Sequence, residues 1–183
     1  MVEPTEETEL ALITQAQIGD RQAFDELVRR HRQGVINVVY RMCGDTHLAE
    51  DAAQDAFIRA WQHLPGYQPR SPFRNWLYRI ATNVALDVLR ADKPTVDVDE
   101  LPLPSSGEGP EAAVEKSERA ESVHRAVLSL PPASRTVLVL REYEGLSYQE
   151  IADTLDIPIG TVMSRLSYAR KLMLESLASY MEG

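Results

Sequence analysis

The chain has 183 residues, 44% of them apolar, and its 19 Lys and Arg against 28 Asp and Glu give a net charge of −9. The apolar content is enough to build a folded core and excludes a fully disordered chain, while the negative charge excludes nucleic-acid binding through bulk positive charge. Any contact with DNA therefore has to be local, and the single cysteine, Cys43, excludes an internal disulfide.

The N-terminal segment, residues 1–9, contains four glutamates, and no basic residue precedes Arg21. This charge pattern is the opposite of that in a secretory or transit peptide. No apolar run approaches the roughly 18 residues that a membrane helix needs. We therefore expect an acidic tail followed by a soluble, cytoplasmic protein with no membrane insertion.

Residues 10–93 are predicted to form a bundle of four helices, because apolar residues recur there at intervals of three and four. The last helix has the clearest start, since Ser71 is a suitable N-cap and Pro72 fits the first helical position. The helices are expected from about Leu10 to before Gly19, from about Phe24 to Gly44, from Asp45 or Thr46 to before Pro65, and from Pro72 to about Ala91.

The helical pattern is lost over residues 94–117, which are rich in Pro, Gly and Ser. Six acids against the single base Lys116 give this segment a charge of 1 − 6 = −5. Such a composition predicts a flexible acidic linker that lets two domains move independently. Association of the linker with a basic face elsewhere in the chain is the alternative.

Residues 118–183 are predicted to form a second helical domain that ends in a helix-turn-helix. Ser147 and Glu150 have the S-x-x-E spacing of a capping box, and Asp156 and Ile157 are expected to make the turn between the paired helices. The predicted helices end before Pro131, run from Pro132 to about Tyr143, from Tyr148 to Leu155, and from about Pro158 to Tyr180.

The last helix has two different faces. At about 100° per residue, one side gathers apolar residues and the other gathers hydroxyls and cations, with Arg165 at the margin. Three bases and no acid lie between Thr161 and Leu174, which is the local charge that a helix in the major groove needs. The apolar side contains Val162, Leu166, Ala169 and Met173, and the polar side Thr161, Ser164, Tyr168 and Lys171.

The sequence offers little for catalysis. Its four histidines are scattered, and Glu121 with His124 make only a single E-x-x-H, whereas a di-iron bundle needs two such pairs. The common glycine-rich phosphate-binding motifs are missing. We expect a protein that is not an enzyme and that holds no metal and no cofactor.

The segment 146–170, LSYQEIADTLDIPIGTVMSRLSYAR, closely resembles the promoter-reading helix-turn-helix of bacterial extracytoplasmic-function (ECF) sigma factors of the sigma-70 family. Three segments of the first domain, GDRQAFDELVRRH, AEDAAQDAFIRAW and FRNWLYRIATNVALDVLR, resemble the sigma-two domain of the same family. The resemblance implies an all-α protein with a sigma-two-like four-helix bundle and a sigma-four-like domain. It further implies a dissociable subunit that binds core RNA polymerase, directs it to promoters, and is itself bound by an anti-sigma factor.

The resemblance also implies roles for particular residues. A polar patch on the third helix, comprising Asp51, Gln54 and Asp55, would dock on the clamp helices of the polymerase beta-prime subunit. On the fourth helix, Arg79 and Arg90 would follow the strand of the melted upstream element while Asn83 takes up a flipped base. The polar face of the last helix, with Thr161, Ser164, Arg165, Tyr168 and Lys171, would contact promoter DNA.

Aromatic residues near the fourth helix are further candidates. Trp61, Trp76 and Tyr78 are possible platforms for stacked bases, although both tryptophans lie on or beside apolar stripes, which favours the core. Met163 and Tyr168 stand where many relatives carry a basic residue, so no particular downstream promoter sequence can be carried over. Tyr168 is expected to contact a phosphate or a thymine methyl instead.

Two other classes of protein remain open from the residues alone. One is a polymerase-independent transcriptional regulator, which would bind its DNA site tightly by itself. The other is a helical adaptor for proteins, which would leave no footprint on DNA with or without polymerase.

Overall fold

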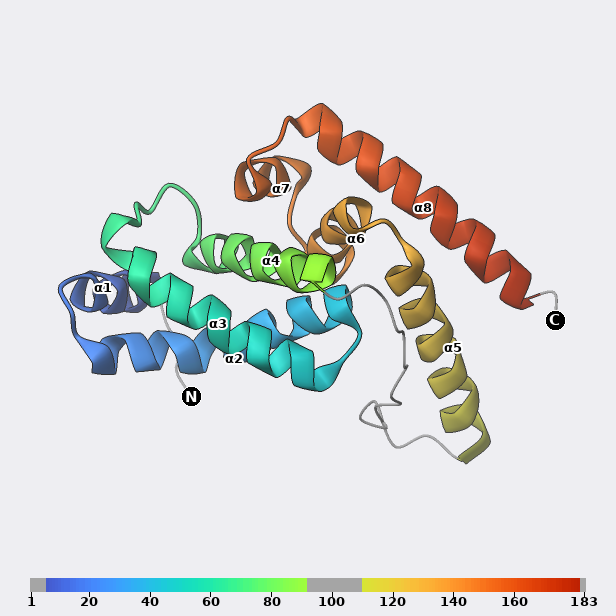
Figure 1. Ribbon diagram of the computed structural model, residues 1–183, viewed down its shortest axis with the longest axis horizontal. Helices are drawn as coiled ribbons and strands as arrows, with labels where there is room; N and C mark the ends of the chain where they lie inside the picture. Colours follow the sequence, from blue (N-terminus) through green and yellow to red (C-terminus); the bar gives the residue numbers. More distant parts are fainter. Residues whose placement is uncertain (1–5, 92–109, 182–183) are drawn as a thin grey trace.

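The computed structural model of the chain describes residues 6–91 and 110–181, and every regular element in these ranges is a helix. The helices form two neighbouring groups (Figure 1), which confirms the prediction of two helical domains. The first group comprises α1 (Glu6–Gln17), α2 (Arg21–Cys43), α3 (Thr46–His63), the 3-10 turn η1 (Leu64–Gly66) and α4 (Phe73–Ala91). The second comprises α5 (Pro110–Ser129), α6 (Pro132–Leu138), the π-helical turn η2 (Val139–Tyr143), α7 (Tyr148–Leu155) and α8 (Ile159–Met181).

Local signals set the ends of the helices in the first domain. The carboxylate of Asp20 accepts hydrogen bonds from two backbone N–H groups in the first turn of α2, and Gly44, with φ of 80°, ends that helix. Asp45 is the N-cap of α3 and accepts a hydrogen bond from the backbone N–H of Leu48 at 2.8 Å. α4 begins at Phe73, one residue later than predicted.

Two helices begin earlier than the sequence predicted. α1 includes residues 6–9, which were assigned to the acidic tail, and α5 includes residues 110–117, which were assigned to the linker. Acidic residues near the N-terminus of a helix are favoured by the helix dipole, and Pro110 fits the first helical position. Acidic composition therefore does not by itself mark where these two helices begin. The remainder of the predicted linker lies outside the described residues.

The core of the first domain is built around the small residues of α3. Because alanine adds little bulk, α2 and α4 can approach α3 closely and bury valines and leucines against it. The alanines of α3 that are buried in this way are Ala49, Ala52, Ala53, Ala56 and Ala60.

The two domains are in contact in this structure, whereas the composition of the linker predicted domains that move independently. α4 lies against α7, and the end of α2 lies against α5 and α6 (Figure 1). Leu128 packs directly on Gly44, and the rings of Tyr40 and His124 stack with centroids 4.9 Å apart. The prediction rested on the composition of the linker, which carries no information about complementary surfaces on the domains that it joins.

Candidate functional site

The helix-turn-helix is formed by α7 and α8. The predicted capping box is present: Ser147 and Glu150 each accept a hydrogen bond from the other's backbone N–H. Asp156 adopts a left-handed conformation with φ of 54° and ends α7, which turns the chain toward α8. Buried Ile151 and Ala152 on α7 face the apolar side of α8, which fixes the two helices relative to each other.

The predicted faces of α8 are confirmed. Val162, Leu166 and Ala169 are fully buried and Met173 is partly buried. The opposite face carries Ser164, Tyr168 and Lys171 as exposed side chains, with Thr161 and Arg165 half-buried at its edges. Tyr168 is 50% exposed, which leaves its hydroxyl and ring edge free to meet a ligand. Met163 is 51% exposed, so α8 also presents apolar surface to solvent.

The charge of α8 is smaller than the sequence indicated. The guanidinium of Arg170 donates to the carboxylate of Glu142 at 2.7 Å and to the hydroxyl of Tyr148 at 3.4 Å. These hydrogen bonds raise the pKa of Arg170 and engage its charge inside the domain. Arg165 and Lys171 thus supply most of the positive charge of this face, and Lys171 lies 3.9 Å from Glu175 in a fully solvated pair.

On α4, the three predicted residues Arg79, Asn83 and Arg90 are all exposed on one flank of the helix. Arg90 lies 3.5 Å from Asp87, which also lies 3.1 Å from Arg59. Arg79 lies 3.8 Å from Asp156, at the turn of the helix-turn-helix in the other domain. The flank therefore carries an acid among its bases.

The aromatic candidates Trp61, Trp76 and Tyr78 pack against other residues of the protein. Trp61 packs against Phe24 with ring centroids 4.9 Å apart, and Trp76 packs against Tyr67 at 5.0 Å. Both tryptophans are half-buried, in agreement with the preference for a core role. Tyr78 is only 3% exposed and contacts the second domain, so it cannot stack on a base in this conformation.

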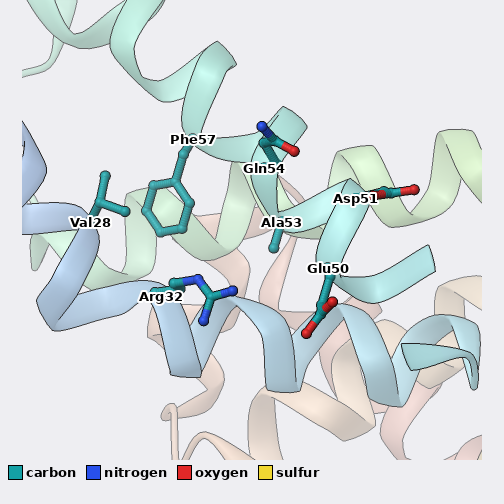
Figure 2. Close-up of a pocket in the computed structure, with 7 residues that line it drawn as sticks. All are labelled: Val28, Arg32, Glu50, Asp51, Ala53, Gln54 and Phe57. Atoms are coloured by element: carbon teal, nitrogen blue, oxygen red, sulfur yellow. The ribbon is translucent and has the colours of Figure 1, made fainter. Parts of the chain in front are cut away.

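The polar patch on α3 is exposed as predicted. Asp51, Gln54 and Asp55 all face solvent, and the first two line a groove of about 440 Å³ between α2 and α3. Figure 2 shows Arg32 extending from α2 and Glu50 extending from α3 toward the space between the two helices, with apolar side chains of both helices beside them. The apolar residues that line the groove are Val28, Ala53 and Phe57.

Sequence reasoning missed Arg32 and Glu50. Glu50 could have been found, because it lies four residues before Gln54 on the same helix. Arg32 comes from a different helix, and no local pattern connects it to the patch. The groove thus adds a base, an acid and apolar side chains to the three predicted residues.

Within the described part of the chain, no helix is long and apolar enough to cross a membrane. Residues 6–91 and 110–181 also contain no group of three or more His, Cys, Asp or Glu side chains arranged to hold a metal ion.

Comparison with known families divides the chain as the fold does. Residues 27–95 match sigma-70 region 2, and residues 120–173 match sigma-70 region 4. The first match covers most of α2 and all of α3 and α4, and the second covers α7 and the greater part of α8. Together they define a promoter-specificity subunit of bacterial RNA polymerase.

Curated relatives extend this similarity over nearly the whole chain. The RNA polymerase sigma-H factor of Pseudomonas aeruginosa is 36% identical over 94% of this chain and 95% of its own. The ECF RNA polymerase sigma-E factor of Escherichia coli K12 is 38% identical over 90% of this chain and 91% of its own. Sigma factor SigW of Bacillus subtilis, also of the ECF type, is 36% identical over 90% and 94%.

A solved structure agrees with the fold. The structure of CnrH in complex with the cytosolic domain of CnrY aligns with a TM-score of 0.70 at 27% identity, over 93% of this chain and 97% of that one. The chain belongs to the ECF RNA polymerase sigma factors of the sigma-70 family. It directs RNA polymerase to promoters, and a polymerase-independent regulator is not favoured because both sigma regions are present.

Proposed function

We propose that this sigma factor uses one surface for core polymerase and two for promoter DNA, and that it has no catalytic activity of its own. The observation that carries the proposal is the separation of these surfaces. The polar patch lies exposed on α3 in the first domain. The face that carries hydroxyls and bases lies exposed on α8 in the second domain. A protein with this arrangement can hold the enzyme and DNA at the same time.

The polymerase surface is the α3 patch together with the groove beside it. Carboxylates of Asp51 and Asp55 suit basic groups of the beta-prime clamp helices, since charge-assisted hydrogen bonds are shorter and stronger than neutral ones. The apolar side chains beside Gln54 offer a place for an aliphatic side chain between such bases. Arg32 and Glu50 add one charge of each sign, which helps to fix the orientation of the partner.

Promoter DNA is bound at two places. On α8, Arg165 and Lys171 supply the charge for phosphates, while Thr161, Ser164 and Tyr168 offer hydroxyls for phosphates or base edges. On α4, Asn83 is the residue for an unpaired base, because its amide has both donor and acceptor atoms. Arg79 lies about one helical turn before Asn83, and Arg90 lies about two turns after it. Both arginines suit the phosphates of the adjacent backbone.

A regulatory protein partner is the remaining part of the proposal. CnrH, which shares the fold, is bound in its structure to the cytosolic domain of CnrY. We expect this chain likewise to be held by an anti-sigma factor when it is not bound to polymerase. Its work on RNA polymerase implies a place in the bacterial cytoplasm.

Charge reversal tests the polymerase surface. Asp51→Arg with Asp55→Arg turns two attractions into repulsions and is expected to weaken binding to core polymerase by about 2 kcal/mol or more. The matched control is Glu118→Arg with Asp153→Arg, which makes the same charge change at exposed positions in the second domain. Normal co-purification of the first variant with core polymerase, at unchanged helical circular dichroism, would remove the patch from the interface.

A further inference from the structure

The second domain touches the first turns of α4 through a row of carboxylates. The hydroxyl of Tyr78 donates to Glu144 at 2.6 Å, and the amide of Asn75 donates to Glu150 at 3.4 Å. Arg79 lies 3.8 Å from the carboxylate of Asp156. Because Asn75, Tyr78 and Arg79 are spaced i, i+3 and i+4, they lie on one face of α4. We call these three contacts the α4 seam.

A second set of contacts holds the domains together at the end of α2. Arg135, on α6, donates to the carbonyl oxygen of Met42 in the first domain and to those of Leu128 and Leu130 in its own. The fit at Gly44 is close, since an added Cβ would lie 2.6 Å from a methyl carbon of Leu128. Arg41 lies over the ring of Tyr143, 4.0 Å from its centroid.

The α4 seam pairs acids of one domain with donors that suit nucleic acid on the other. A carboxylate and a phosphate present the same kind of acceptor oxygen to a guanidinium, a hydroxyl or an amide. Arg79 is thus bound to Asp156 at the site where the proposed function requires a DNA phosphate. Asn83, one turn further along, has no part in the seam and stays exposed.

We propose that the second domain of the free protein is an intramolecular cover for the start of α4, in which Glu144, Glu150 and Asp156 take the place of nucleic-acid phosphates. The inference rests on the proposed function of α4. DNA and the cover compete for Arg79, so the domains separate when α4 engages a strand.

The contact between Arg79 and Asp156 is the part of the cover that is suited to release. Arg79 and Asp156 are 48% and 84% exposed at their side chains, so salt screens their attraction and a competing phosphate can reach them. Glu150 is also a member of the capping box, and its hydrogen bonds with Ser147 lower its pKa and keep it ionised. The ionisation of Glu150 therefore depends mainly on its own helix rather than on the contact with α4.

The test removes two of the three carboxylate charges and leaves α7 intact. Glu144→Gln with Asp156→Asn spares the capping box, and asparagine tolerates the left-handed conformation at position 156. The matched control, Asp153→Asn with Glu118→Gln, makes the same charge change at exposed positions outside the seam. The free full-length proteins are compared by small-angle X-ray scattering and by their affinity for a random single-stranded oligodeoxynucleotide pool.

The seam variant is expected to have a larger radius of gyration than wild type and to bind the oligonucleotide pool roughly three- to fivefold more tightly than the control. Wild type should expand in the same way when salt is raised. Unchanged scattering of the seam variant would overturn the cover and leave the assignment of α4 to DNA standing. If the seam variant expands but binds the oligonucleotide pool no more tightly than the control, the cover is also overturned. In that case the second domain would hide no DNA-binding surface on α4.

Discussion

Replacement of Arg135 by methionine tests how the two domains are held together. The side chain is only 7% exposed, and its guanidinium supplies the donors for the carbonyl oxygens of Met42, Leu128 and Leu130. Arg135→Met keeps most of the side-chain volume, so the change removes hydrogen bonds without leaving a large cavity.

The magnitude follows from these contacts. Each buried carbonyl that loses its donor costs about 1 kcal/mol, so three of them cost about 3 kcal/mol. Part of this is offset because the variant no longer buries a charge, a penalty that also lowers the pKa of Arg135. We expect a net loss of about 2 kcal/mol, which at a urea dependence of about 2 kcal/mol/M moves the unfolding midpoint down by about 1 M.

The assay is urea unfolding of the full chain followed by circular dichroism. Arg125→Met is the control, because Arg125 lies on α5 with an exposed side chain 3.8 Å from Glu121. The control is expected to shift the midpoint little, since exposed ion pairs contribute at most about 1 kcal/mol. Equal midpoints for wild type and Arg135→Met would refute the reasoning, because the three carbonyls would then not depend on this side chain.

Three further predictions concern single side chains. Lys171→Ala should lower the slope of log affinity against log salt for promoter binding by the holoenzyme by about 0.9, as expected for one phosphate contact, and an unchanged slope would remove Lys171 from the interface. Asn83→Ala should cost about 1 to 3 kcal/mol of base discrimination on a template whose upstream element is already mismatched open; an unaltered base preference would mean that the base is read elsewhere. His124, stacked on Tyr40, has its pKa lowered by burial and by Arg41 and Arg135, against an opposing effect of Glu121. Its contribution to stability is therefore complete above the ordinary value of 6.5 and is lost as the pH falls through the lowered pKa, and His124→Phe, which keeps a ring on Tyr40, should remove this part of the pH dependence of urea unfolding.

The helices and the helix-turn-helix could be predicted because their signals are local. The capping box at Ser147, the cap at Asp45 and the glycine at position 44 each act within one turn of the chain. The alternation of faces on α8 likewise depends only on spacing along one helix. Residues whose role is set by a single helix, such as Tyr168 and Lys171, were therefore placed correctly on its exposed face.

The contacts between domains could not be predicted in this way. Arg135 follows two prolines in a segment that offers no sign of a buried charge, and its first-domain partner Met42 is 93 positions away. Tyr78 was expected to be available for stacking, yet its hydroxyl bonds to Glu144 across the domain boundary. Such pairings depend on how two finished surfaces fit, which no pattern within either segment records.

The most direct test of the central claim is transcription in vitro with purified core RNA polymerase on a pool of promoter fragments, with and without this protein. The account predicts transcripts from a discrete set of start sites that appear only when the protein is added. It also predicts that the Asp51→Arg, Asp55→Arg variant gives none of them while its charge-matched control gives them all. If core polymerase produces no new transcript with the wild-type protein, the assignment as a working sigma factor is contradicted. Tight DNA binding by the protein alone would then indicate a polymerase-independent regulator. No DNA binding with or without polymerase would indicate a protein adaptor.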